Sequence, residues 1–333
     1  MKRILFFLGW ILTAACAATA ADLKVGVIGL DTSHSVEFTR IIHEGGKNPQ
    51  QAAKLQGLRV TAAYPQGSKD IPESVQRVPE YTEKMRALGV EIVDSLDALV
   101  ERVDAVLLES NDGKVHWEQL QPVLKAKKPV FVDKPVAASL ADCLRIYHAA
   151  EAAGVPIFSS SALRFGQATL QAREGKTGAV KHVEAYSPAH VEKSHPDLFW
   201  YGIHGVEPLF TVLGQGAVEV RRGVTEDGLI QVTGTWRNGS TGVFKEANKS
   251  TRQGYGGSAK SATGSLVLSG FEGYEPLVVA IADFFRTGKA PVSAEETLEI
   301  YAFMEAADES KRRGGARVSL TEVLAKAKAA LAP

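Results

Sequence analysis

Histidines and carboxylates gather in one short part of the second half of the chain. The cluster consists of His190, Glu192, His195, Asp197, His204 and Glu207. His204 and Glu207 are three positions apart, so both can lie on one face of a helix. Imidazole and carboxylate groups suit proton transfer with a hydroxyl substrate, and they also bind divalent cations. Because the spacing matches no zinc motif, the cluster favours a polar substrate pocket, and we assign no metal ligand.

Aromatic residues lie within the same segment. Phe199, Trp200 and Tyr201 lie shortly before His204. Aromatic rings beside polar groups suit stacking against the face of a sugar. Ordinary packing between domains explains them equally well. We therefore place Trp200 and Tyr201 on the substrate side of the predicted site.

A second set of residues follows the first apolar run of the chain. Leu23–Gly29 predicts a buried strand, and the chain continues Gly-Leu-Asp-Thr-Ser-His. A strand, a glycine turn and a helix are typical of a dinucleotide-binding domain, whose helix N-terminus binds the pyrophosphate. Asp31 and His34 replace the second and third glycines of G-x-G-x-x-G. The predicted cofactor contacts in this turn are Gly29, Asp31, Thr32, Ser33 and His34.

Further polar residues follow two more predicted strands. Ser110 ends the run Ala105–Ser110, His116 lies shortly after it, and Asp133-Lys134-Pro135 follows Val130–Val132. Ligands collect at the carboxyl ends of the strands in an open α/β sheet. We therefore assign Ser110, His116 and Lys134 to the cofactor side, and expect Lys134 also to relay a proton. The alternative for Lys134 is a solvated surface lysine.

The two halves of the chain differ in their patterns. Short apolar strands alternate with helical segments in the first half, which predicts a Rossmann-like parallel sheet with helices on both faces. Alternating strands followed by helices predict an α+β second half with a mainly antiparallel open sheet. We expect a signal peptide at 1–20, a nucleotide-binding domain at 21–160 and a substrate and oligomerisation domain at 161–333. The stretch 254–264 predicts a surface loop or a lid.

The first residues have the features of a secretory signal peptide. Lys2 and Arg3 precede an apolar stretch, and Ala18-Thr19-Ala20 supplies a cleavage motif. The apolar part is shorter than the roughly 20 residues that a membrane span needs. We therefore predict a periplasmic or secreted protein with no membrane contact after cleavage. The net charge of +0 argues against a nucleic-acid partner.

Taken in order, these motifs resemble the Gfo/Idh/MocA family of oxidoreductases. The resemblance rests on the opening strand, His116, Asp133-Lys134-Pro135, Ala162–Phe165 and the segment from Tyr201 to Glu207. It implies oxidation or reduction of a sugar, inositol or related polyol with NAD or NADP, and assembly into a dimer or tetramer. It further implies that His204 is the acid–base residue and that Lys134 is the family lysine. Arg164 is expected to pair with the substrate or with a structural acid.

Several positions depart from the family pattern. Trp200 stands where an Asp often precedes the histidine, and the second strand ends at Ala63-Tyr64-Pro65 without an acid for the ribose. Asp31 would repel a pyrophosphate unless it points away or binds a cation. Two alternatives therefore stay open: a non-redox carbohydrate-active enzyme or lyase, with or without a metal, and a non-catalytic carbohydrate-binding protein. A tightly retained NAD(P) would reconcile an oxidoreductase with export.

Overall fold

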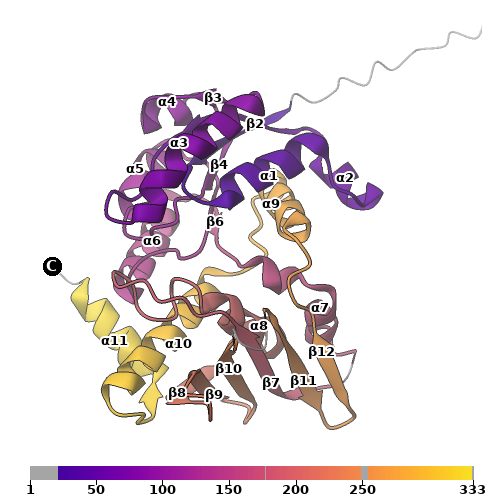
Figure 1. Ribbon diagram of the computed structural model, residues 1–333, viewed down its shortest axis with the longest axis vertical. Helices are drawn as coiled ribbons and strands as arrows, with labels where there is room; N and C mark the ends of the chain where they lie inside the picture. The colour runs from indigo at the N-terminus through magenta and orange to yellow at the C-terminus, as the bar shows by residue number, and fades with distance from the viewer. Residues whose placement is uncertain (1–21, 177, 249–253, 332–333) are drawn as a thin grey trace, which may run out of the picture.

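The computed structural model describes residues 22–176, 178–248 and 254–331. The chain forms two lobes, each built on one sheet, and Figure 1 shows the lobe of the first half at the top. The predicted signal peptide at 1–20 lies outside the described residues. Within the described ranges, no helix combines the length and the apolar character needed to cross a membrane.

The first lobe contains a parallel sheet of six strands in the order β3-β2-β1-β4-β5-β6. Its strands are β1 Leu23–Ile28, β2 Leu58–Tyr64, β3 Glu91–Ile92, β4 Ala105–Leu108, β5 Val130–Val132 and β6 Ile157–Phe158. Every residue of β4 and β5 is buried, as expected for a parallel sheet with both faces covered. The strand order reverses between β1 and β4, so the ligand crevice of this fold lies above these two strands.

Six helices connect the strands of the first sheet. They are α1 Ser33–Glu44, α2 Pro49–Leu55, α3 Pro72–Ala87, α4 Leu96–Val100, α5 His116–Lys125 and α6 Leu140–Ala153. The side chain of Thr32 caps α1, and that of Ser139 caps α6, which satisfies backbone N–H groups at both helix starts. The predicted parallel Rossmann-like sheet is therefore confirmed, with short elements between β2 and β4 that the sequence did not predict.

The second lobe contains a seven-stranded sheet in the order β12-β11-β7-β10-β9-β8-β13. Its strands are β7 Val180–Ser187, β8 Ala217–Val224, β9 Ile230–Trp236, β10 Thr241–Glu246, β11 Gly256–Ser261, β12 Ser265–Leu268 and β13 Val318–Ser319. Among the described strands of this second sheet only β7 and β10 pair in parallel, so the mainly antiparallel sheet is confirmed. The predicted loop or lid at 254–264 is wrong, because β11 pairs with both β7 and β12.

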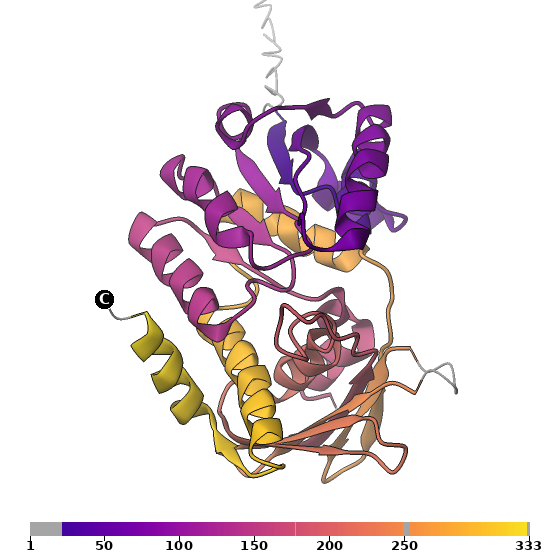
Figure 2. The ribbon, with the colours of Figure 1, turned by 60° about the vertical axis from the view of Figure 1, so that its left-hand side comes forward.

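Helices cover one face of the second sheet and leave the other face open, as Figure 2 shows. The covering helices of this lobe are α7 Gln167–Arg173, α8 Ile203–Leu213, α10 Ala294–Arg312 and α11 Leu320–Ala330, preceded by the 3₁₀ turn Ala162–Phe165. In β9 the residues Val232 and Trp236 are buried beneath helices, while the alternate residues are only half-buried. This alternation is that of a sheet with one solvated face.

After β12, the chain returns to the first lobe. Helix α9, Glu275–Thr287, lies beside α1 in Figure 1. Its buried residues Ile281 and Phe284 belong to the same apolar cluster as Phe38 and Phe158. The rings of Phe158 and Phe284 are 4.8 Å apart. The second half of the chain therefore completes the core of the first lobe.

Gly29 is required by the approach of β1 to β4. Its φ is +93°, and a Cβ at this position would lie 2.3 Å from the backbone nitrogen of Ser110. We expect Gly29→Ala to lower the free energy of unfolding by about 2–5 kcal/mol, through backbone strain and crowding together. Gly154→Ala is the matched control, because its φ is +63° but nothing lies within 4 Å. If denaturant unfolding gives equal losses of free energy of unfolding for Gly29→Ala and Gly154→Ala, crowding at Gly29 has no effect on stability.

Candidate active site

A pocket of about 670 Å³ opens at the carboxyl ends of the parallel strands, between the two lobes. This volume is within the usual range for small-molecule sites. From the first lobe, the wall includes the start of α1 and the loops after β4 and β5. From the second lobe, it includes the segment before α8. The predicted residues that line it are Thr32, Ser33, His34, Lys134, His190, Trp200, Tyr201 and His204.

The two predicted catalytic residues come from different lobes and meet at this pocket. Lys134 follows β5 and is 6% exposed. His204 lies in the first turn of α8, and its Nδ1 is 2.8 Å from the hydroxyl of Ser161. Burial holds the pKa of His204 well below its ordinary value, and the positive charges of Lys134 and His34 add to the effect. At neutral pH the imidazole is therefore neutral and able to accept a proton.

Arg164 and Glu207 form a buried ion pair outside the pocket wall. Arg164 Nε donates to a Glu207 oxygen at 2.6 Å, and its Nη2 lies 2.7 Å from Glu296. Glu207 also accepts from the Ser160 hydroxyl and from the backbone N–H of Ser161. This placement confirms the expectation that Arg164 pairs with a structural acid, and it corrects the alternative that Arg164 and Glu207 contact the substrate. They hold the segment that carries Ser161 against α8, and so they position His204 indirectly.

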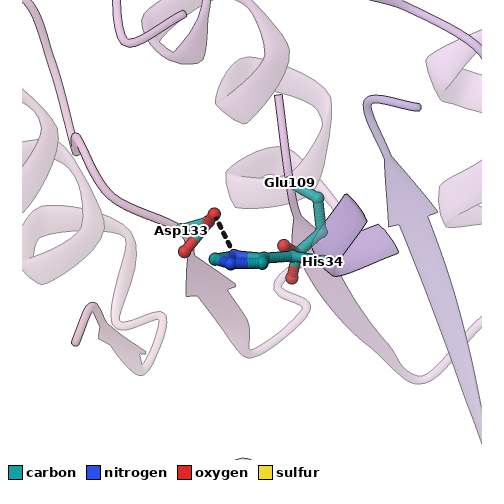
Figure 3. A group of neighbouring side chains, drawn as sticks. All are labelled: His34, Glu109 and Asp133. Atoms are coloured by element: carbon teal, nitrogen blue, oxygen red, sulfur yellow. Dashed lines mark hydrogen bonds and ion pairs between the residues drawn. The ribbon is translucent and has the colours of Figure 1, made fainter. Parts of the chain in front are cut away.

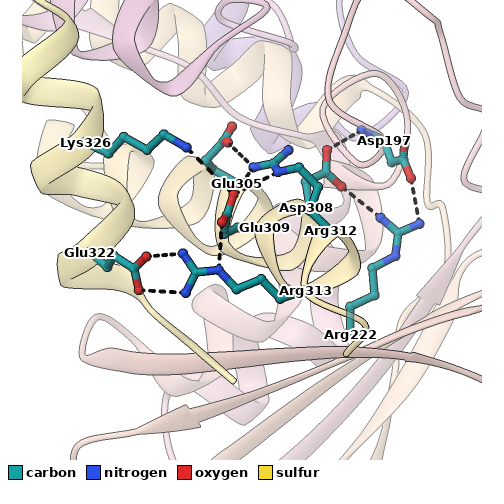
Figure 4. Close-up of polar contacts among 9 residues, drawn as sticks. All are labelled: Asp197, Arg222, Glu305, Asp308, Glu309, Arg312, Arg313, Glu322 and Lys326. Atoms are coloured by element: carbon teal, nitrogen blue, oxygen red, sulfur yellow. Dashed lines mark hydrogen bonds and ion pairs between the residues drawn. The ribbon is translucent and has the colours of Figure 1, made fainter. Parts of the chain in front are cut away.

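The predicted cluster around His204 does not converge on one point. Asp197 accepts from Arg222 and Lys311 at 2.7 Å each, away from the pocket, and Figure 4 shows the contact with Arg222. His195 lies behind Trp200, with its Nε2 3.5 Å from Asp112. Burial lowers the pKa of His195 to about 4. His195 and Asp197 are therefore supporting residues, which corrects their assignment to the substrate.

Asp31 is fully buried and points away from the start of α1. Its carboxylate accepts from the Ser74 hydroxyl at 2.7 Å and from the backbone N–H of Asn111 at 2.9 Å. These bonds join the turn after β1 to α3 and to the loop after β4. Asp31 therefore contacts no ligand at the helix start, which corrects its assignment and removes the predicted repulsion of a pyrophosphate.

Gly29, Ser110 and His116 also lie behind the pocket wall. The two ring nitrogens of His116 lie 3.0 and 2.7 Å from the carbonyl oxygens of Val136 and Ser110. The Ser110 hydroxyl accepts from Gln119. These residues fix the loops after β4 and β5 relative to each other. Their predicted cofactor contacts are corrected to a supporting role.

His34 reaches across the crevice to the end of β5. Its Nδ1 lies 2.7 Å from a carboxylate oxygen of Asp133, as Figure 3 shows. Although burial raises the pKa of Asp133, the nearby His34 and Lys134 outweigh it and lower the value to about 2. The His34 ring also stacks on Phe38 and meets Tyr274 edge-on. The third position of the glycine motif thus carries a side chain that crosses the ligand crevice.

The sequence did not identify several residues at the site. Glu109 directly follows β4 and is fully buried beside His34 and Asp133. A carboxylate directly after a buried strand was the signal for it. Tyr255, Phe271 and Tyr274 contribute further aromatic rings to the pocket wall. The hydroxyl oxygens of Tyr255 and Tyr201 are 2.9 Å apart. These aromatic residues come from distant segments, so no local pattern indicated them.

Comparison with known proteins agrees with this architecture. Residues 23–161 match the model of the Gfo/Idh/MocA oxidoreductase family, described by its NAD-binding Rossmann fold. Inositol 2-dehydrogenase 1 of Mycolicibacterium vanbaalenii is 30% identical over 145 residues, which cover 43% of this chain and 37% of that protein. The chain spans less than two-fifths of the length of the curated relatives it matches.

Solved structures share both lobes. A probable dehydrogenase from Thermotoga maritima superposes with a TM-score of 0.71 at 21% identity, over 90% of this chain and 100% of that one. The scyllo-inositol dehydrogenase of Lactobacillus casei was solved with NAD(H) and scyllo-inositol. It superposes with a TM-score of 0.67 at 16% identity, over 90% of this chain and 99% of that one. At these identities the likeness shows the fold. Residues 23–161 therefore match the Gfo/Idh/MocA oxidoreductase family, and the chain as a whole has the two-lobed fold of these solved structures.

Proposed function

We propose that this protein is an NAD(P)-dependent dehydrogenase of a sugar, an inositol or a related polyol. One observation carries the proposal. Lys134 and His204, from different lobes, line a single pocket whose wall includes the start of α1. The family of the first lobe and the scyllo-inositol-bound relative support the cofactor and the substrate class. The aromatic wall of Trp200 and Tyr201 suits the apolar face of a cyclic polyol.

The residues at the start of α1 fit a dinucleotide. The first turn of α1 has no acidic residue, and Asp31 faces inward. A helix start without an acidic residue in its first turn favours a phosphate. Thr32 and Ser33 would hold the pyrophosphate, and Lys134 would bridge cofactor and substrate. When bound, the nicotinamide supplies the acceptor for the hydride.

The remaining chemistry is proton transfer by the chain's own residues. During oxidation, the neutral His204 accepts the proton of the reacting hydroxyl, while the hydrogen on carbon leaves with its electron pair. Ser161 fixes the orientation of the His204 ring through Nδ1. The ammonium group of Lys134 orients the hydroxyl and stabilises negative charge that develops on its oxygen.

The direct test is nucleotide content together with turnover. Tag-free protein is denatured, and the released nucleotide is identified by mass spectrometry. Fresh protein is then assayed with NAD or NADP and a panel of inositols and sugars, by the absorbance of the reduced nicotinamide. We expect bound or measurably binding nucleotide and turnover of at least one polyol. No released nucleotide and no affinity for reduced NAD(P) would refute the proposal.

The depressed pKa of His204 predicts the pH dependence of oxidation. Only the neutral imidazole accepts a proton, and its pKa lies well below the ordinary 6.5 because of burial, with Lys134 and His34 adding to the effect and Asp133 opposing it. We therefore expect kcat/KM to stay constant as pH falls to 6.5 and to decline only below it. A decline centred at or above 6.5 would contradict the role of a buried neutral His204. The measurement is a pH–rate profile at saturating nucleotide.

Two further features of the protein are part of the proposal. The charged, apolar and small-residue pattern of residues 1–20 supports export, which subcellular fractionation of the native host tests. The open face of the second sheet, where Val267 of β12 is largely exposed, supports a dimer or tetramer. Light scattering of the purified protein tests the oligomeric state.

A further inference from the structure

A buried carboxyl group without a partner lies beside His34 and Asp133, two residues of the pocket wall. Glu109 is 0% exposed, and neither of its oxygens has a hydrogen-bond partner among the described residues. One oxygen of Asp133 is buried and unpartnered in the same way. Buried polar atoms are paired in most proteins, since leaving a carboxyl unpaired is costly. Two such groups side by side therefore point to a missing partner.

A third donor completes the arrangement. His34, Glu109 and Asp133 each offer one donor atom, and these atoms lie within 4.8 Å of one another. The three residues come from the start of α1, the end of β4 and the end of β5. Figure 3 shows their side chains gathered above the strands. This position is the switch point of the strand order, where ligands of such sheets bind.

We propose that His34, Glu109 and Asp133 bind a divalent cation of the first transition row. One imidazole nitrogen and two carboxylate oxygens suit Mn²⁺, Fe²⁺, Co²⁺ or Zn²⁺ better than Ca²⁺ or Mg²⁺, which prefer oxygen donors alone. The two carboxylates balance the charge of the cation.

Binding replaces the hydrogen bond between His34 and Asp133. Their atoms are now 2.7 Å apart, whereas donors bound at about 2.0–2.2 Å around one ion stand about 3 Å apart or more. The pair therefore opens by a few tenths of an ångström, and the shared proton is released. His34 and Asp133 also line the pocket, so the coordination positions left free are open to an oxygen of water or of a polyol.

A competing explanation is that Glu109 stays protonated and binds no cation. Burial and the nearby Asp133 raise its pKa well above the ordinary value, so a neutral acid is chemically reasonable. The two explanations differ in metal affinity. A neutral acid gives no cation site, and Glu109→Gln then replaces one neutral group with another of similar shape.

The test is metal binding by the tag-free full protein, without nucleotide or substrate. Protein stripped by a chelator is titrated with Mn²⁺, Co²⁺ and Zn²⁺ by calorimetry, and the metal content of untreated protein is measured by mass spectrometry. We expect a single equivalent to bind, and Glu109→Gln to weaken binding more than about 100-fold, beyond the effect of changing a residue that only supports a ligand. Asp112→Asn is the matched control, because Asp112 is also buried beside a histidine, at 3.5 Å from His195.

The outcomes separate cleanly. The proposal is overturned if none of the three ions binds tightly at one equivalent per chain. It is also overturned if folded Glu109→Gln binds the ion with unchanged affinity. If Glu109→Gln fails to fold, His34→Ala replaces it, because that side chain is 11% exposed and unchanged affinity there is equally decisive. A protein that binds the cation but has no affinity for NAD(P) would support this site and refute the dehydrogenase, whereas a protein that binds NAD(P) but no cation would do the opposite.

Discussion

His204→Ala is expected to lower kcat for polyol oxidation by about 100- to 10,000-fold. The variant loses the neutral imidazole that accepts the hydroxyl proton, while the contacts at the start of α1 are untouched. Nucleotide affinity should therefore remain that of the unmodified protein. Steady-state kinetics with the best polyol and fluorescence titration with reduced nucleotide measure the two quantities separately.

The matched control is His182→Ala in the same lobe. His182 lies on β7, and its Nδ1 is 2.8 Å from the Thr241 hydroxyl, away from the pocket wall. We expect its kcat to be unchanged. If His204→Ala retains the original rate, or if both variants lose activity equally, the assignment of His204 as the proton acceptor is wrong.

Arg164→Met is expected to destabilise the protein by about 3–5 kcal/mol. The substitution leaves the carboxylates of Glu207 and Glu296 buried without their cation, since Arg164 is 1% exposed and contacts both. Denaturant unfolding followed by circular dichroism measures the loss. Arg313→Met is the control, because its ion pair with Glu322 is on the surface and should contribute little.

A second substitution distinguishes charge burial from lost packing. Glu207→Gln in the Arg164→Met background removes one of the stranded charges and should recover part of the stability. If the double variant is no more stable than Arg164→Met, the ion pair is not the source of the loss. Glu207 also accepts a hydrogen bond from the backbone N–H of Ser161, whose hydroxyl contacts His204. We therefore expect a reduced kcat in variants that still fold.

The fold could be predicted where burial alone decides it. The apolar runs that became β1, β4 and β5 are buried on both faces, so their pattern is unambiguous. Strand β11 was not predicted, because its sequence Gly-Gly-Ser-Ala-Lys-Ser has little strand propensity. Its place in the sheet comes from pairing with β7 and β12, which is a property of distant segments.

The site could be predicted only in part, for a similar reason. Lys134 was located by its place after a buried strand, and His204 by the family resemblance. Arg164 and Asp197 have the same residue types as ligand-binding groups, but both are neutralised by partners far along the chain. Sequence shows which charges exist, whereas pairing among them depends on the tertiary structure. Glu109 illustrates the reverse, since its significance depends on His34 and Asp133 beside it.

The position of α9 has a consequence for the order of folding during synthesis. The first sheet is complete at residue 158, yet Phe284 contacts Phe158 in its core. A chain that emerges from its N-terminus therefore exposes an apolar face of the first lobe until α9 has been made. The two lobes should mature together late in synthesis, and a fragment that ends near residue 160 should be insoluble.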